Sequence, residues 1–146
     1  VLISPWGDLT CSGESIHANA DNDPLIPLGA LRFVAKSYSR GQDAAAPLLS
    51  PVFADYRGLP PLLIQVGSTE VLYSDAVRVA DQAERAGVEH TLQVWEQMPH
   101  VFHALAAWLP EASMALREIG VFVNARLGHS DEAAHVRARA QIAGGY

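Results

Sequence analysis

The sequence predicts an α/β fold in which about three parallel strands are flanked by helices. Apolar runs at 62–66 and 91–95 are each followed by a loop and then by apolar residues at helical spacing. A shorter apolar run, 1–3, opens the chain. Strands that alternate with helices form parallel sheets with right-handed crossovers and helices on both faces. We therefore expect a layered arrangement in a chain of 146 residues, an ordinary length for one domain.

The first half of the chain alternates short elements with long irregular segments. Residues 1–3 are predicted to be the end of a buried strand, because a proline two residues later cannot donate to a continuing ladder. Residues 8–27 are rich in Ser, Gly, Asn, Asp and Pro, which predicts a long loop of the kind that often carries function. Helical spacing of apolar residues then predicts a helix over 28–38. Three prolines within 44–60 indicate a segment that crosses the surface.

The second half is predicted to run strand, helix, strand, helix. Residues 62–66 are almost entirely apolar, as strands of parallel sheets covered on both faces are. Ser74 is the predicted N-cap of a helix that ends at Gly87. Residues 91–95 alternate like a second strand, and a long amphipathic helix follows up to Gly128.

The pattern of large apolar residues sets the predicted domain boundary. Residues 1–127 carry the predicted elements, whereas 128–146 have few large apolar residues and are predicted to form a loose helix or a disordered tail. The first residues include no initiator Met and no basic region of a signal peptide. We therefore expect the chain to begin inside a larger fold.

The composition limits the classes of function. The net charge of −6 is spread along the chain, which argues against a nucleic-acid surface. No apolar run approaches the ~20 residues of a membrane-spanning helix. A single cysteine, Cys11, excludes an internal disulfide and is consistent with a reducing compartment. We expect a cytoplasmic protein that acts on a small molecule.

Two polar residues follow the predicted strands and are the candidate catalytic residues. Glu70 lies just beyond the strand at 62–66, and His100 lies just beyond the strand at 91–95. In open α/β sheets, catalytic groups collect past the carboxyl ends of neighbouring strands. A histidine that takes a proton from a serine needs a carboxylate to fix its tautomer and to stabilise the imidazolium. The order acid then histidine is the order in which a hydrolase triad ends.

Asp75 is the alternative acid, because it also follows the first of these strands. An acid in the first turn of a helix is, however, stabilised by the helix dipole whether or not it takes part in chemistry. We therefore favour Glu70 as the partner of His100.

Two other arrangements use the same histidine. His100, His103 and Glu96 could form a metal site, but the surrounding residues are apolar, and His103 is expected to line or support the pocket. Cys11, His100 and Asn124 occur in the order of a papain-like protease. The sequence around the cysteine does not match that class, and Asn124 is predicted to lie on the exposed side of the last helix.

Three motifs in one order give the chain a family resemblance. They are Ser-Pro-Trp-Gly-Asp-Leu-Thr at 4–10, Leu-Pro-Pro-Leu-Leu-Ile-Gln-Val-Gly-Ser-Thr-Glu-Val-Leu at 59–72 and Met-Pro-His-Val-Phe at 98–102. With these motifs, residues 1 to 127 resemble the C-terminal part of the bacterial hormone-sensitive-lipase-like carboxylesterases, which have the α/β-hydrolase fold. The resemblance implies that the three strands are strands 6 to 8 of an eight-stranded sheet. It also implies that His100 is the triad base and Glu70 its acid, although many relatives carry Asp-Pro-Leu where this chain has Glu-Val-Leu.

The resemblance also implies what the chain lacks. The nucleophilic serine, in a Gly-x-Ser-x-Gly elbow, and the glycine-rich oxyanion loop belong to the preceding half of such enzymes, and neither motif occurs here. The implied reaction is hydrolysis of short-chain carboxylic esters without a metal or an organic cofactor. The implied partner is the N-terminal half of the same enzyme, or another copy, and the chain alone is expected to be inactive or nearly so. The alternative function is a non-catalytic association module that binds a partner through an exposed sheet edge.

Overall fold

The computed structural model describes residues 1–128, which contain one parallel sheet. Its strands are β1 (Leu2–Ile3), β2 (Leu62–Gly67) and β3 (His90–Trp95), and they pair in the order β1-β2-β3. Both pairings are parallel, and Ile64 of β2 lies between Leu2 and Leu92. The predicted α/β class with three parallel strands is therefore confirmed.

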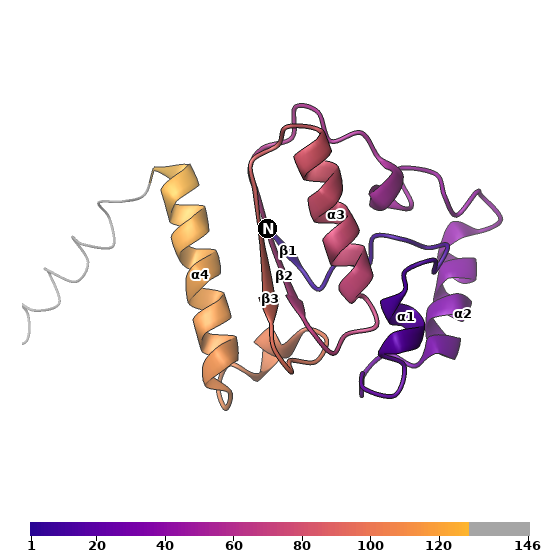
Figure 1. Ribbon diagram of the computed structural model, residues 1–146, viewed down its shortest axis with the longest axis horizontal. Helices are drawn as coiled ribbons and strands as arrows, with labels where there is room; N and C mark the ends of the chain where they lie inside the picture. The colour runs from indigo at the N-terminus through magenta and orange to yellow at the C-terminus, as the bar shows by residue number, and fades with distance from the viewer. Residues whose placement is uncertain (129–146) are drawn as a thin grey trace, which may run out of the picture.

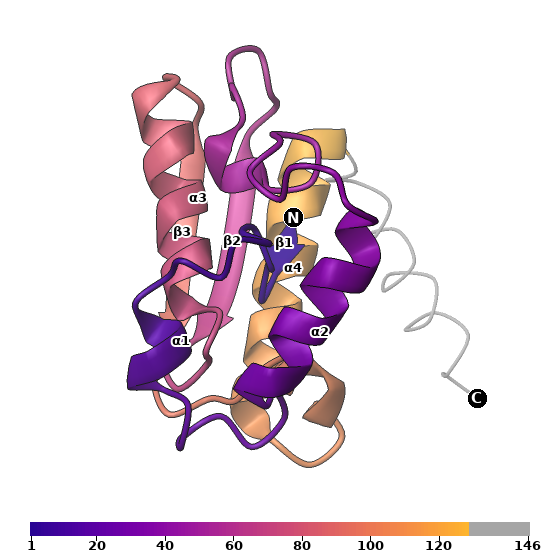
Figure 2. The ribbon, with the colours of Figure 1, turned by 90° about the vertical axis from the view of Figure 1, so that its right-hand side faces the viewer.

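Helices cover both faces of this sheet. The α-helices are α1 (Ser15–Ala18), α2 (Leu28–Ser39), α3 (Tyr73–Arg85) and α4 (Pro110–Leu127), and the 3₁₀ helices are η1 (Pro51–Phe53) and η2 (Phe102–Leu105). Helix α4 lies on one side of the sheet, and α3, α1 and α2 lie on the other (Figure 1). Seen from that second side, α2 passes in front of α4, and α1 lies near the lower end of α3 (Figure 2).

The central strand β2 divides the core into two parts. Ile64 and Val66 are completely buried and pack with Val79 and Ala83 of α3. Gln65 points to the opposite face, where its amide donates a hydrogen bond to the Ala115 carbonyl of α4. Because successive side chains of a strand point to opposite faces, this alternation places α3 and α4 on opposite sides of the sheet.

Helix α3 ends as predicted but begins differently. Its last residue, Arg85, lies two positions before Gly87, whose φ of +68° is readily adopted by glycine. Ser74, however, is not its N-cap, because the helix starts at Tyr73. The Ser74 hydroxyl instead accepts a hydrogen bond from the Ser15 amide at 2.9 Å, and the Ser15 hydroxyl accepts one from the Ser74 amide at 2.8 Å. This reciprocal exchange joins α1 to α3.

The long irregular segments are more buried than their composition predicted. Residues 8–27 include α1 and the completely buried Ile16. Within 44–60, Ser50 is completely buried and Val52 packs in the core beside α3. Both segments lie against α3 because side chains within them are apolar or hydrogen-bonded. The proline and glycine content of a segment does not predict such burial.

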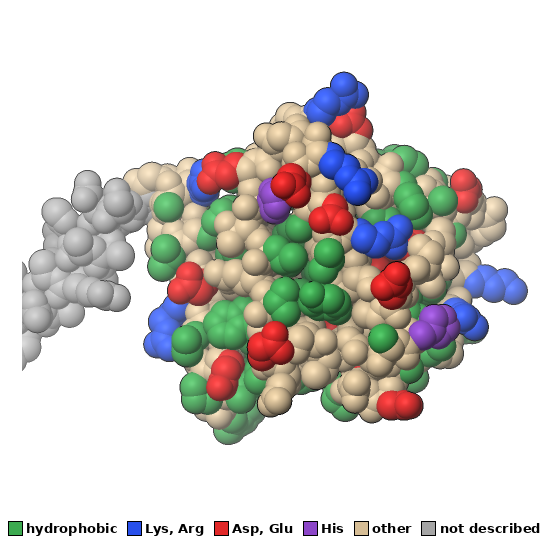
Figure 3. All heavy atoms as spheres, in the orientation of Figure 1, with side chains coloured by type: hydrophobic (Ala, Val, Ile, Leu, Met, Phe, Trp, Pro, Cys, Tyr) green, Lys and Arg blue, Asp and Glu red, His purple; other side chains and the backbone are tan. Residues whose placement is uncertain are grey.

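The surface agrees with the scattered charge of the sequence. On the face seen in Figure 3, basic and acidic side chains are interspersed, and apolar side chains gather near the centre between them. Among residues 1–128, no helix is long and apolar enough to cross a membrane. The predicted tail, apart from Gly128, lies outside the described residues.

Candidate active site

Glu70 is held in the turn between β2 and α3. Its side chain is completely buried, and its Oε1 accepts hydrogen bonds from the Gly67 amide at 2.6 Å and from the Ser4 hydroxyl at 2.7 Å. A buried carboxylate is costly unless donors surround it. These two donors fix one carboxylate oxygen and leave Oε2 for another partner.

That partner is His100, which lies in the loop between β3 and η2. Its Nδ1 is 2.9 Å from Glu70 Oε2, and its side chain is 20% exposed. Because a carboxylate oxygen accepts, Nδ1 is the ring nitrogen that carries the donated proton. The remaining nitrogen, Nε2, is then free to exchange a proton with a substrate or nucleophile. The structure thus brings together the two residues that the sequence singled out.

Close contact between two loops keeps this pair together. Ser68 donates from its amide to the Trp95 carbonyl at 2.9 Å, and the Thr69 hydroxyl donates to the Met98 carbonyl at 2.8 Å. A Cβ at Gly67 would lie only 1.9 Å from the Met98 oxygen. Glycine is therefore required where β2 ends, because any side chain would push the His100 loop away from Glu70.

Two residues of the segment 8–27 support the turn that carries Glu70. The Asn19 amide donates to the Glu70 carbonyl at 2.9 Å and to the Ser68 carbonyl at 3.1 Å. The Asp23 carboxylate accepts a hydrogen bond from the Val71 amide at 3.0 Å. Neither residue was identified from the sequence. The only available signal was the prediction that this long segment carries function.

An apolar pocket of about 290 Å³ opens beside His100. Ser4 and His100 are its polar lining residues, and its apolar lining consists of Trp6, Ile26, Ala30, Leu31, Val34 and Leu72. Most of this lining comes from α2 and from the segment that precedes it. His100 therefore borders an apolar pocket.

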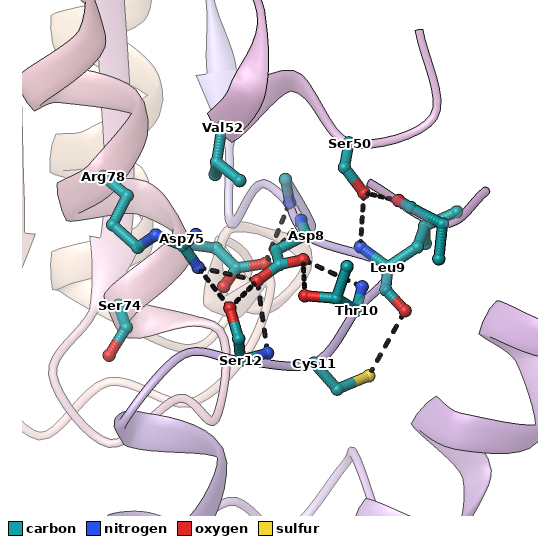
Figure 4. A network of polar contacts seen from close by, with 12 residues as sticks. Asp8, Leu9, Thr10, Cys11, Ser12, Ser50, Val52, Ser74, Asp75 and Arg78 are labelled. Carbon is teal, nitrogen blue, oxygen red and sulfur yellow. Dashed lines mark hydrogen bonds and ion pairs between the residues drawn. The ribbon is translucent and has the colours of Figure 1, made fainter. Parts of the chain in front are cut away.

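Asp75, the alternative acid, is used elsewhere. It is completely buried, and its Oδ2 accepts hydrogen bonds from the amides of Gly7 and Asp8, both at 3.0 Å (Figure 4). Its Oδ1 is buried without a hydrogen-bond partner among residues 1–128. Burial, together with the charge of Asp8, raises the pKa of Asp75 to about 6 despite the two backbone donors. Asp75 holds the 7–8 backbone against α3, and Glu70 is the acid beside His100.

Asp8 forms the other half of this network. Its carboxylate accepts from the hydroxyls of Thr10 and Ser12 at 2.5 Å and from Arg78 at 2.7 Å (Figure 4). Burial alone would raise the pKa of Asp8, but these hydrogen bonds outweigh it and lower the pKa to about 2. Two adjacent buried carboxylates therefore have pKa values shifted in opposite directions.

His103 supports the site from the opposite face of the sheet. It is buried, and its Nε2 lies 2.8 Å from Gln65 Oε1. Burial lowers the pKa of His103, which keeps the ring neutral at neutral pH. Across residues 1–128, no three His, Cys, Asp or Glu side chains are grouped to hold a metal ion. The structure therefore gives His103 a packing role and does not assemble the metal set with Glu96.

The papain-like arrangement is not assembled either. The Cys11 thiol points to the Leu9 carbonyl (Figure 4), whereas Asn124 is exposed on α4, across the sheet. Burial and the charges of Asp8 and Asp75 raise the pKa of Cys11, which disfavours the reactive thiolate.

Comparison with known proteins places this geometry in a family. Residues 1–104 match the family described as having the alpha/beta hydrolase fold. The chain belongs to the α/β-hydrolase family. An acetyl-hydrolase of Streptomyces hygroscopicus is 42% identical over 128 residues, which are 88% of this chain and 43% of the relative. An esterase of Acinetobacter venetianus is 39% identical over 123 residues, which are 84% of this chain and 41% of the relative.

Solved hydrolase structures agree with this assignment. A hormone-sensitive lipase from a metagenome library superposes with a TM-score of 0.83 at 41% identity, covering 85% of this chain and 43% of that structure. An esterase from the bacterial hormone-sensitive lipase family gives a TM-score of 0.80 at 44% identity, covering 82% of this chain and 40% of that structure. The predicted resemblance to the C-terminal portion of these esterases is confirmed. This α/β-hydrolase chain spans about two fifths of the length of the relatives that it matches.

Proposed function

We propose that Glu70 and His100 are the acid and the base of a Ser–His–Glu triad that hydrolyses carboxylic esters. The observation that carries this proposal is the 2.9 Å contact between Glu70 Oε2 and His100 Nδ1. The acid is completely buried, while the imidazole reaches a pocket. This combination fixes the tautomer on one side of the ring and leaves the other side open to a substrate.

The reaction follows from these positions. As a serine oxygen attacks the ester carbonyl carbon, His100 Nε2 accepts the hydroxyl proton and then returns it to the departing alcohol. Glu70 stabilises the imidazolium through Nδ1 during this transfer. In the second half-reaction, His100 takes a proton from water, the water oxygen attacks the acyl carbon, and the proton returns to the serine oxygen as the acid leaves.

The nucleophile is supplied from outside this chain. The 146 residues contain no Gly-x-Ser-x-Gly elbow. Ser4, which lines the pocket with His100, is unsuited to attack because its hydroxyl donates to Glu70 and accepts from the Val101 amide. Because the nucleophile and the oxyanion donors supply much of the rate enhancement, the chain alone is expected to be inactive or nearly so.

The partner proposed for this chain is the nucleophile-bearing part of a hydrolase. Among residues 1–128, β1 pairs with β2 alone. Val1, which precedes β1, is 46% exposed, and Ile3, the last residue of β1, is 38% exposed. An unpaired parallel edge with apolar side chains favours addition of another strand. The small apolar pocket beside His100 suits a short acyl or alcohol group.

A chimaeric enzyme tests this proposal. In it, the segment of the Streptomyces hygroscopicus acetyl-hydrolase that aligns with this chain is replaced by this chain. We expect the chimaera to hydrolyse p-nitrophenyl acetate. His100→Ala should abolish turnover, and Glu70→Gln should lower kcat on the order of 10³-fold or more. Asp75→Asn is the matched acid control and should retain turnover.

The outcomes separate the catalytic proposal from a purely associative role. A folded chimaera in which His100→Ala leaves hydrolysis unchanged would contradict the catalytic assignment, as would a folded but inactive chimaera. Thermal unfolding measured by circular dichroism reports folding in each case. If this host does not fold with the inserted chain, the Acinetobacter venetianus esterase serves as the second host.

A further inference from the structure

Ser4 lies where three parts of the candidate site meet. It follows β1, is 4% exposed, and donates its amide proton to the Gln65 carbonyl at 2.7 Å, which continues the pairing of β1 with β2. Its hydroxyl donates to Glu70 Oε1 at 2.7 Å and accepts from the Val101 amide at 3.1 Å. Val101 is the residue that follows His100. One side chain therefore contacts the acid and the loop of the base, and its backbone anchors it to the sheet.

We infer that Ser4 is a positioning residue that sets the orientation of the Glu70 carboxylate and the place of the His100 loop. This inference rests on the proposed function of the same pair. The inference adds a residue whose hydroxyl bonds Glu70 and the Val101 amide and takes no part in the proton transfers described above. Its effect reaches His100 only through Glu70 and through the backbone of Val101.

Both hydroxyl contacts are needed for this role. The terminal torsion of a glutamate is broad, so a carboxylate held at one oxygen by a single donor retains considerable freedom to turn. The Gly67 amide and the Ser4 hydroxyl approach Oε1 together, which directs Oε2 toward His100 Nδ1. The hydrogen bond from Val101 places the imidazole loop relative to the same hydroxyl.

The backbone gives independent support. Ser4 has φ of +45° and Val101 has φ of +46°. Non-glycine residues seldom adopt this left-handed region, and a β-branched residue such as valine does so at a cost that the surrounding structure must offset. Both ends of the Ser4–Val101 hydrogen bond are thus held in unfavourable backbone conformations. Two of the five non-glycine residues with positive φ in residues 1–128 are thus joined by this one hydrogen bond, which favours a role in the site over simple filling of space.

Two substitutions and one control test the inference. Ser4→Ala removes the hydroxyl, and Ser4→Gly removes it while also relieving the left-handed backbone. Ser50→Ala is the matched control, because Ser50 is also completely buried and its hydroxyl accepts from the Leu9 amide at 2.7 Å and donates to the Ala44 carbonyl at 2.6 Å. The Ser50 hydroxyl bonds the Leu9 amide beside Asp8 (Figure 4), and its hydrogen-bond partners include neither Glu70 nor His100.

A merely structural role of Ser4 would leave the tautomer of His100 unchanged, so this tautomer is the property to measure. Nitrogen NMR of the ¹⁵N-histidine-labelled chain, at about pH 8.5 where an ordinary imidazole is neutral, gives the ratio of the Nδ1–H to the Nε2–H form. Both Ser4 variants should lower this ratio by about tenfold, the effect of weakening one charge-assisted hydrogen bond. Ser50→Ala should leave the ratio unchanged, and Glu70→Gln provides the reference for complete loss of the acid.

Each outcome decides the inference. An unchanged ratio in folded Ser4→Ala and Ser4→Gly chains would overturn it. Unfolding of both variants while Ser50→Ala stays folded would also overturn it, since Ser4 would then be needed only for the fold.

The chimaera described above adds a kinetic readout. There, the two Ser4 variants should lower kcat by about ten- to a hundredfold with little change in KM. Because the tautomer ratio requires no turnover, loss of the proposed function would appear as an inactive chimaera with a normal ratio. Failure of the Ser4 inference would instead appear as an unchanged ratio.

Discussion

Replacing Asp75 by Asn should remove a pH dependence of stability that this one buried carboxyl creates. Asn keeps an oxygen that can accept from the Gly7 and Asp8 amides, which now donate to Asp75 Oδ2. It cannot ionise. The substitution therefore isolates the cost of placing a charge on Asp75, beside Asp8 and away from water.

The magnitude follows from the pKa of Asp75. Burial raises this pKa from its ordinary value of 3.8 to about 6. Between these values the unfolded chain has lost the proton that the folded chain still binds, so the free energy of unfolding falls as pH rises. At about 1.4 kcal/mol per pH unit, the loss approaches about 3 kcal/mol, and it is complete above pH ~6. The stabilising contribution is fully present only below about pH 4.

Urea unfolding of both proteins, followed by circular dichroism from about pH 4 to 7, measures this effect. The free energy of unfolding of Asp75→Asn minus that of the unsubstituted chain should rise by about 3 kcal/mol across the range. Asp8 should not obscure the rise, because its pKa of about 2 places its contribution below about pH 4. Asp81→Asn controls for the removal of one negative charge from α3. A difference that stays constant between pH 4 and 7 would refute the argument.

Three further substitutions test local packing and hydrogen bonding, two of them in the candidate site and one in α4. Gly67→Ala should destabilise the chain by about 3 kcal/mol and separate Glu70 from His100, because the added Cβ would lie 1.9 Å from the Met98 oxygen. Urea unfolding measures the first effect, and the tautomer of His100 measures the second. Gly120→Ala, in α4, should instead stabilise the chain by about 0.5–1 kcal/mol in the same unfolding experiment, because the added Cβ would meet no atom within 4 Å beyond its own helix turn. Asn19→Ala should cost about 1–2 kcal/mol by leaving two turn carbonyls without its amide, and equal stability with the unsubstituted chain would contradict this.

The elements that the sequence could predict are those with a clear period. Apolar runs predicted β2 and β3, and helical spacing before Gly87 and Gly128 predicted where α3 and α4 end. The pairing of Glu70 and His100 could also be predicted. Neighbouring parallel strands end at the same edge of a sheet, so residues just past those ends must lie close together.

Contacts between side chains that are far apart in the sequence could not be predicted from it. The sequence showed Ser4 only as the first residue of the motif at 4–10, directly after a predicted strand end, yet its hydroxyl bonds Glu70, which is 66 positions away. The prediction for Ser74 was wrong because local capping preference cannot anticipate the exchange with Ser15 across 59 positions. Asn19 and Asp23 occur in a composition typical of loops. Such residues form turns in most proteins, and only the tertiary structure decides that here they support the turn that carries Glu70.

The contacts around Glu70 indicate which catalytic groups each part of the proposed enzyme would contribute. Its carboxylate receives donors from Ser4, Gly67 and His100, and its backbone carbonyl receives the Asn19 amide, all from within this chain. None of these contacts needs the nucleophile-bearing part. The tautomer of His100 should therefore be set before any serine arrives. Docking of the missing part would then supply the nucleophile to an existing base, so the rate deficit of the isolated chain should arise from the absent serine and oxyanion donors.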